Sequence, residues 1–89
     1  MMKNKSTVAK LDLRTFILHQ LSVVNKILKD ETKVIDEETV IYCDGFSKAI
    51  FLLAWQYDLI KDETIKQMKE IIECQIQVYA CAFAEAENG

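Results

Sequence analysis

The sequence predicts an all-α protein, a small three-helix bundle or set of helical hairpins packed as a homodimer, and three observations predict it. The 89 residues contain no proline and only two glycines, whereas average usage would give roughly four prolines and six glycines. Apolar residues recur at helical spacing in three successive segments. The composition, 51% hydrophobic and 28% charged, is typical of a folded globular chain. We therefore expect one domain over residues 1–89, with residues 1–6 as a disordered N-terminus.

The first helix is predicted over residues 7–29. Its apolar positions follow steps of three and four residues and form one core stripe, which comprises Leu13, Phe16, Ile17, Leu21, Val24, Ile27 and Leu28. Leu11 and Leu18 lie off this stripe and form a smaller apolar patch. The acidic segment that starts at Asp30 is expected to end the helix.

The second helix is predicted over residues 37–60. Asp36 precedes it and carboxylates occupy its first turn, an arrangement that suits the positive end of a helix. The β-branched residues between Thr39 and Cys43, followed by Asp44 and Gly45, leave an alternative open, which is a short strand and turn with a helix starting at Phe46. An isolated strand would have no partner in this chain, so the helix is preferred.

The third helix is predicted over residues 62–87, opened by Asp62, Glu63 and Thr64. Its core stripe comprises Ile65, Met68, Ile72, Ile76, Tyr79 and Phe83, and Ile71 and Val78 widen it. Only Lys61 separates this helix from the second one. The alternative is a single continuous helix over residues 37–87, which would need a partner along its length in an intertwined dimer.

The size and the cysteines of the chain bear on stability and location. A chain this short buries only a little over about 60% of the surface that it exposes when unfolded, so self-association is the expected additional stabiliser. Cys43, Cys74 and Cys81 are odd in number and lack metal-ligand spacing, which predicts reduced thiols in a cytoplasmic protein. The most apolar stretch, residues 40–60, contains charged residues, so no membrane span is expected.

Catalytic chemistry is not predicted. The single histidine, His19, lies on the polar side of the first helix without a carboxylate one turn away. The sequence has no HExxH motif and no glycine-rich phosphate-binding loop. We therefore expect no enzyme activity, no metal site and no cofactor. A redox role for Cys74 and Cys81, which share a helix face, is the alternative to inert thiols.

Charge is unevenly distributed along the chain, whose net charge is −3. Residues 1–35 carry seven basic and three acidic side chains, net +4, whereas residues 36–89 carry four basic and eleven acidic ones, net −7. The two halves are expected to attract each other within or between chains. The alternative function is nucleic-acid binding by the basic face of the first helix, through Lys3, Lys5, Lys10, Arg14 and Lys26.

The second helix carries the most informative feature, because it is apolar on nearly all sides. The predicted core stripe comprises Tyr42, Phe46, Ala49, Leu53, Tyr57 and Ile60, and the predicted polar stripe comprises Asp44, Ser47, Lys48, Asp58 and Asp62. Phe51 and Trp55 fall in the middle of this polar stripe, with Leu52 and Leu59 on its flank. Either the other two helices cover this aromatic pair or it forms an interface.

These observations predict a non-enzymatic protein-interaction module. It would act as a small regulator, inhibitor or adaptor, of a kind that bacteria or phages encode, by binding a larger protein, a second copy of itself, or both. The expected interface residues are Phe51, Trp55, Asp44, Lys48, Asp58, Leu52 and Leu59.

Overall fold

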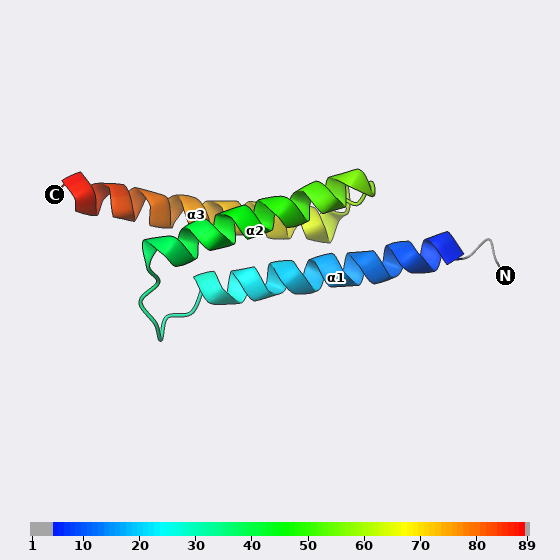
Figure 1. Ribbon diagram of the computed structural model, residues 1–89, viewed down its shortest axis with the longest axis horizontal. Coiled ribbons are helices and arrows are strands. Elements are labelled where there is room, and N and C mark those ends of the chain that lie inside the picture. The colour runs from blue at the N-terminus through cyan, green and yellow to red at the C-terminus, as the bar shows by residue number, and fades with distance from the viewer. Residues whose placement is uncertain (1–4, 89) are drawn as a thin grey trace.

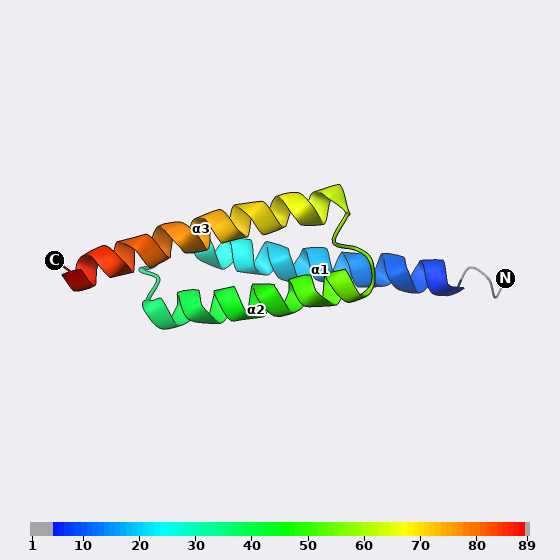
Figure 2. The same ribbon diagram turned by 90° about the horizontal axis from the view of Figure 1, so that it is seen from above.

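The structure, a computed structural model that describes residues 5–88, is a bundle of three helices that all contact one another (Figure 1). Helix α1 spans Lys5–Leu28, α2 spans Glu37–Gln56 and α3 spans Glu63–Asn88. Helix α2 runs antiparallel to its neighbours, and a second view shows α1 behind α2 and α3, crossing the space between them (Figure 2). The all-α, three-helix prediction is confirmed.

Helix α1 begins at Lys5, two residues earlier than predicted, and residues 1–4 lie outside the described part of the chain. Four of its predicted core residues are buried, namely Ile17, Leu21, Val24 and Leu28. Phe16 and Ile27, predicted as core, lie instead at the edge of this stripe and are exposed. Leu18, predicted off the stripe, packs against the core.

Helix α2 begins as predicted. Asp36 has extended backbone angles, and its carboxylate accepts a hydrogen bond of 2.8 Å from the backbone N–H of Thr39. This satisfies one of the free N–H groups of the first helical turn. Residues 39–45 are helical, so the strand-and-turn alternative, with a helix starting at Phe46, is wrong.

Helix α2 ends at Gln56, four residues before the predicted end at Ile60. Asp58 adopts a left-handed backbone conformation with φ of 58°. The N–H of Leu59 donates to the carbonyl of Ala54 at 2.7 Å, and the N–H of Asp58 donates to that of Trp55 at 3.2 Å. These two bonds form a Schellman motif, which satisfies the last carbonyls of the helix. The continuous helix over residues 37–87 is therefore wrong.

The buried face of α2 is not the predicted one. Ser47, predicted as polar surface, is 2% exposed, and its hydroxyl donates to the carbonyl of Asp44. Phe51 is 7% exposed, whereas Tyr42, predicted as core, is 67% exposed. The buried residues of the helix are Val40, Cys43, Ser47, Ile50, Phe51 and Ala54. Because α2 is apolar on nearly all sides, its periodicity did not select the face that α1 and α3 cover.

Helix α3 contributes the face that was predicted for it. Ile65 and Ile72 are fully buried, and Met68, Ile76 and Tyr79 pack against the core. The Tyr79 hydroxyl donates to the carbonyl of Leu28 at 2.9 Å, which ties α3 to the last turn of α1. Over residues 5–88, none of the helices has the length and hydropathy that a membrane crossing requires.

Candidate functional site

A stripe of exposed, mainly apolar residues runs along α2 outside the face that packs against α1 and α3. We call it the α2 outer stripe, and it comprises Ile41, Gly45, Lys48, Leu52 and Trp55. Trp55 is 66% exposed, Ile41 63% and Leu52 58%. Successive members are four, three, four and three residues apart, the spacing that keeps side chains on one face of a helix that packs against another. The face is therefore suited to contact with a helix of a partner.

The two aromatic residues predicted to form the interface, Phe51 and Trp55, have different environments in the structure. Phe51 lies in the core, and the Nζ of Lys69 on α3 is 5.7 Å from its ring centroid. Trp55 projects into solvent. Of these two side chains, Phe51 therefore stabilises the fold, and Trp55 is the one accessible to a partner.

The remaining predicted interface residues have different environments. Asp44 and Lys48 form an ion pair of 3.1 Å one turn apart on α2. Leu52 is exposed next to Trp55 on the helix surface, Asp58 is exposed in the turn after α2, and Leu59 packs partly against the core. The structure therefore brings Lys48, Leu52 and Trp55 onto one face, with Asp44 at its edge.

Ile41 and Gly45 belong to the same stripe and were not among the predicted interface residues. A Cβ atom placed on Gly45 would meet nothing within 4 Å, so no contact within the chain requires glycine there. The signal that identifies both residues was present in the sequence. Counting back from Trp55 in steps of three and four residues passes through Leu52, Lys48, Gly45 and Ile41.

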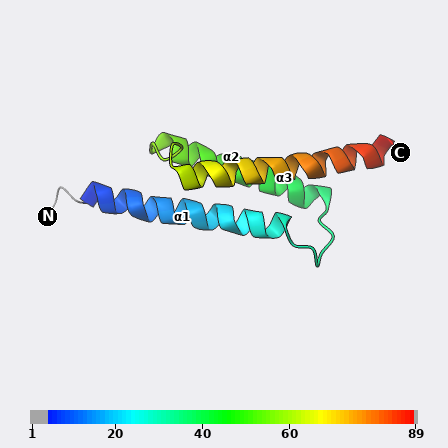
Figure 3. The ribbon, with the colours of Figure 1, turned by 180° about the vertical axis from the view of Figure 1, so that it is seen from behind.

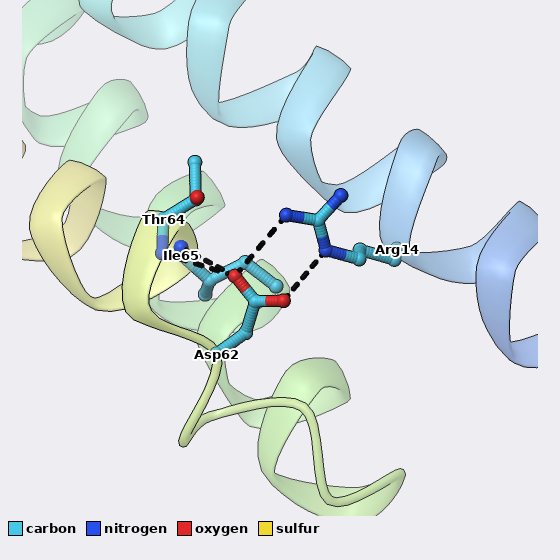
Figure 4. A network of polar contacts seen from close by, with 4 residues as sticks. All are labelled: Arg14, Asp62, Thr64 and Ile65. Carbon is cyan, nitrogen blue, oxygen red and sulfur yellow. Dashed lines mark hydrogen bonds and ion pairs between the residues drawn. The ribbon is translucent and has the colours of Figure 1, made fainter.

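Asp62 forms the principal polar network of the bundle, between the first turns of α3 and the middle of α1 (Figure 4). Its carboxylate accepts from Arg14 Nε at 2.6 Å and from the backbone N–H groups of Thr64 and Ile65 at 3.0 and 3.2 Å. Hydrogen bonds from Arg14 hold the pKa of Asp62 below its usual value, and the same contact raises the pKa of Arg14. This network is structural, because it joins a helix N-terminus to the neighbouring helix.

The basic residues predicted for nucleic-acid binding do not form one stripe where the structure describes their side chains. Arg14 is held by Asp62, and Lys26 is exposed. The two positions are separated by about 18 Å along α1 and about 120° around it. Lys3 lies outside the described residues, and Lys5 and Lys10 lie on the first turns of α1.

The groups that could support chemistry are dispersed. Cys43 is buried, and desolvation raises the pKa of its thiol. Cys74 and Cys81 are exposed free thiols on α3, and His19 is exposed on α1. Within residues 5–88, no three histidine, cysteine or carboxylate side chains gather closely enough to hold a metal ion.

No family model matches the sequence, and neither the curated proteins nor the solved structures contain a significant match to it.

Proposed function

We propose that this protein is a non-enzymatic interaction module, a small helical regulator, inhibitor or adaptor that binds a partner protein through the α2 outer stripe. The observation that carries the proposal is the exposure of Trp55 beside Leu52 and Ile41 on one face of α2. Tryptophan is enriched among the residues that dominate binding energy, because its large surface loses contact with water in the complex. Covering the stripe with a partner therefore removes a large apolar surface from water.

Gly45 supports contact with a helix. A glycine in a helix interior destabilises it by about 1 kcal/mol relative to alanine, and nothing in the chain occupies the space beside this one. The missing side chain lets the backbone of another helix approach the centre of the stripe closely. We infer that the glycine at position 45 contributes to binding of the partner and not to the stability of the free chain.

The charges around the stripe indicate the kind of partner. The stripe itself contains one charged side chain, Lys48, and Asp44 neutralises it. Helix α2 carries three carboxylates, on Glu37, Glu38 and Asp44, against the single lysine Lys48, so the helix that bears the stripe is acidic. The partner we expect presents an apolar groove or helix face bordered by basic side chains, the arrangement that complementary potentials favour.

The test uses the partner that immobilised wild-type protein retains from an extract of the source cells, purified and then titrated back. Replacing Leu52 and Trp55 together with alanine should weaken binding about thirty-fold or more, because a central tryptophan commonly contributes about 2 kcal/mol. Both side chains are exposed, so the helical circular dichroism and the unfolding midpoint should stay close to wild type.

Ile71→Ala is the matched control, since Ile71 is also an exposed large hydrophobic residue but lies on α3. It should bind the partner as the wild type does. If the Leu52→Ala, Trp55→Ala variant binds with unchanged affinity, the stripe is not the binding site. The nucleic-acid alternative gains no support from Arg14, which Asp62 occupies, and we do not propose it.

A further inference from the structure

A second apolar surface lies over the groove between α1 and α2. It consists of two stripes with the same three- and four-residue steps, one on each helix. We call it the α1–α2 face, and it comprises Leu13, Phe16, Gln20, Val23 and Ile27 on α1 and Tyr42, Phe46, Ala49, Leu53 and Gln56 on α2. None of these ten residues is charged.

Two contacts to α3 show that both stripes border the same groove. Arg14 on α1 binds Asp62 at the N-terminus of α3, and Phe51 on α2 lies beneath Lys69 of α3. The centre of the α1 stripe lies about 140° around its helix from Arg14, and the centre of the α2 stripe lies about 180° around its helix from Phe51, with the buried core residues in between. Figure 1 shows α2 in front of α3 with α1 beside them, and Figure 3, seen from behind, shows α3 in front of α2.

The α1–α2 face has a floor and two raised edges. Leu13, Phe46 and Leu53 are partly buried against the core and form the floor. Phe16, Val23 and Ile27 project along one edge, and Tyr42 projects along the other, where its ring stacks on Phe46 at a centroid distance of 6.0 Å. Large apolar side chains therefore remain exposed along α1 and in the first turns of α2.

We infer that a second copy of this chain covers the α1–α2 face. Helices α1 and α2 of the two copies then form a four-helix bundle around a two-fold axis. The inference rests on the proposed function, because it assigns a self-association surface to an interaction module. An antiparallel helix pair with heptad-spaced apolar residues is half of a four-helix bundle, and two such halves bury each other.

The size of the face is appropriate for a dimer. The stripes extend for about 30 Å, the length of a 20-residue helix, and two packed helices span about 20 Å, which gives a footprint of about 600 Å². A standard interface buries about 800 Å² of accessible surface on each partner, and a corrugated helical surface has more accessible area than its flat footprint. The face thus matches a stable dimer more closely than a small peptide ligand.

The charges of α1 and α2 indicate which helix of one copy lies opposite which helix of the other. Residues 1–35, which include α1, have a net charge of +4, and residues 36–89 have −7. Placing α1 of one copy antiparallel to α2 of the other sets exposed Lys26, in the last turn of α1, opposite exposed Glu38, in the first turn of α2. We therefore expect each α1 to lie antiparallel to the partner's α2.

The test measures molar mass in solution by light scattering or sedimentation, under reducing conditions because Cys74 and Cys81 are exposed. The wild type should have twice the 10.3 kDa mass of one chain. Val23→Glu should raise the dimer dissociation constant at least tenfold and leave a helical monomer, since Val23 is exposed in the single chain. Ile71→Glu, an equally exposed position on α3, should remain a dimer.

A third variant, Leu52→Glu with Trp55→Glu, separates this inference from the proposed function. It should remain a dimer but lose the partner, whereas Val23→Glu should lose the dimer and keep the partner. A monomeric wild type, or a Val23→Glu variant that stays dimeric, overturns the inference. Loss of the dimer in the Leu52→Glu, Trp55→Glu variant alone also overturns it, because the copies would then meet through the α2 outer stripe. Unchanged partner binding by that variant overturns the proposed function.

Discussion

Asp58 occupies a backbone conformation that glycine adopts more readily. Its φ of 58° lies in the left-handed region, where a side chain other than glycine is disfavoured by roughly 1–2 kcal/mol, although aspartate is among the better tolerated residues. The Schellman motif that ends α2 depends on this conformation, because it aligns the N–H groups of Asp58 and Leu59 with the last carbonyls of the helix.

Asp58→Gly should therefore raise the free energy of unfolding by about 0.5–1 kcal/mol, since relief of strain exceeds the added freedom of the unfolded chain. Urea denaturation monitored by circular dichroism measures the change. Asp58→Ala is the control, because alanine keeps the Cβ and should give no stabilisation. Equal stabilisation by both variants would mean that the left-handed backbone is not the cause.

The start of α3 depends on one carboxylate that acts on two elements. Asp62 caps the first turn of α3 and binds Arg14 of α1, so it closes the turn after α2 and holds α1 in place. Asp30 and Asp36 have more local roles in the segment between α1 and α2. Hydrogen bonds from Thr32 and Thr39, respectively, lower their pKa values.

These lowered pKa values predict the direction of the pH dependence. The unfolded chain takes up protons near the ordinary aspartate pKa of about 3.9, whereas the folded chain holds these carboxylates ionised to lower pH. Stability should be constant near neutral pH and decline as the pH falls below about 4. Urea midpoints measured from pH 7 to pH 2.5 test this expectation.

Two substitutions of Asp62 separate its charge from its capping role. Asp62→Asn keeps a capping oxygen and should flatten the acid decline, whereas Asp62→Ala should in addition lower stability at pH 7 by about 1 kcal/mol. An Asp62→Asn profile with the wild-type slope would assign the acid sensitivity to other groups.

At the scale of the element, the first residues of α2 and α3 could be predicted from the sequence, whereas the buried face of α2 could not. Asp36 and Asp62 mark the starts of α2 and α3, because a short acidic side chain can accept hydrogen bonds from the free N–H groups of the first helical turn. The end of α2 was missed because Asp58 stands where a glycine would have signalled it. The buried face of α2 was predicted wrongly because Ser47, a polar residue, is buried and Tyr42, an aromatic residue, is exposed. When a helix is apolar on nearly all sides, only its packing against α1 and α3 determines which side is buried.

At the scale of the whole molecule, the bundle is long and narrow, 62 × 23 × 19 Å. Each of its three helices buries only one side, and large apolar residues remain exposed on all three, including Phe16, Trp55 and Val78. A chain of this size has a small core, so association that covers such surface adds stability that increases with the logarithm of protein concentration.

We therefore predict that the thermal midpoint of the wild type rises with protein concentration. A hundredfold increase stabilises a folded dimer by about 2.7 kcal/mol, which corresponds to a rise of several degrees. Scans at about 2 and about 200 µM provide the measurement. The midpoint of Val23→Glu should not move with concentration, and a wild-type midpoint that is equally insensitive would contradict self-association.

The sequence by itself determined that this protein is helical, where α2 and α3 begin, and which stripe of α3 contains its buried residues, although Ile71 and Val78, predicted to widen that stripe, are exposed. Its scarcity of glycine and proline, its acidic caps and the clear periodicity of α3 are local features whose physics does not need the rest of the chain. It also indicated that α2 carries more apolar surface than its neighbours cover. Only the tertiary structure decided that Phe51 is covered and Trp55 is not. That choice depends on how α1 and α3 are placed around α2, and an evenly apolar helix does not encode it in its own spacing.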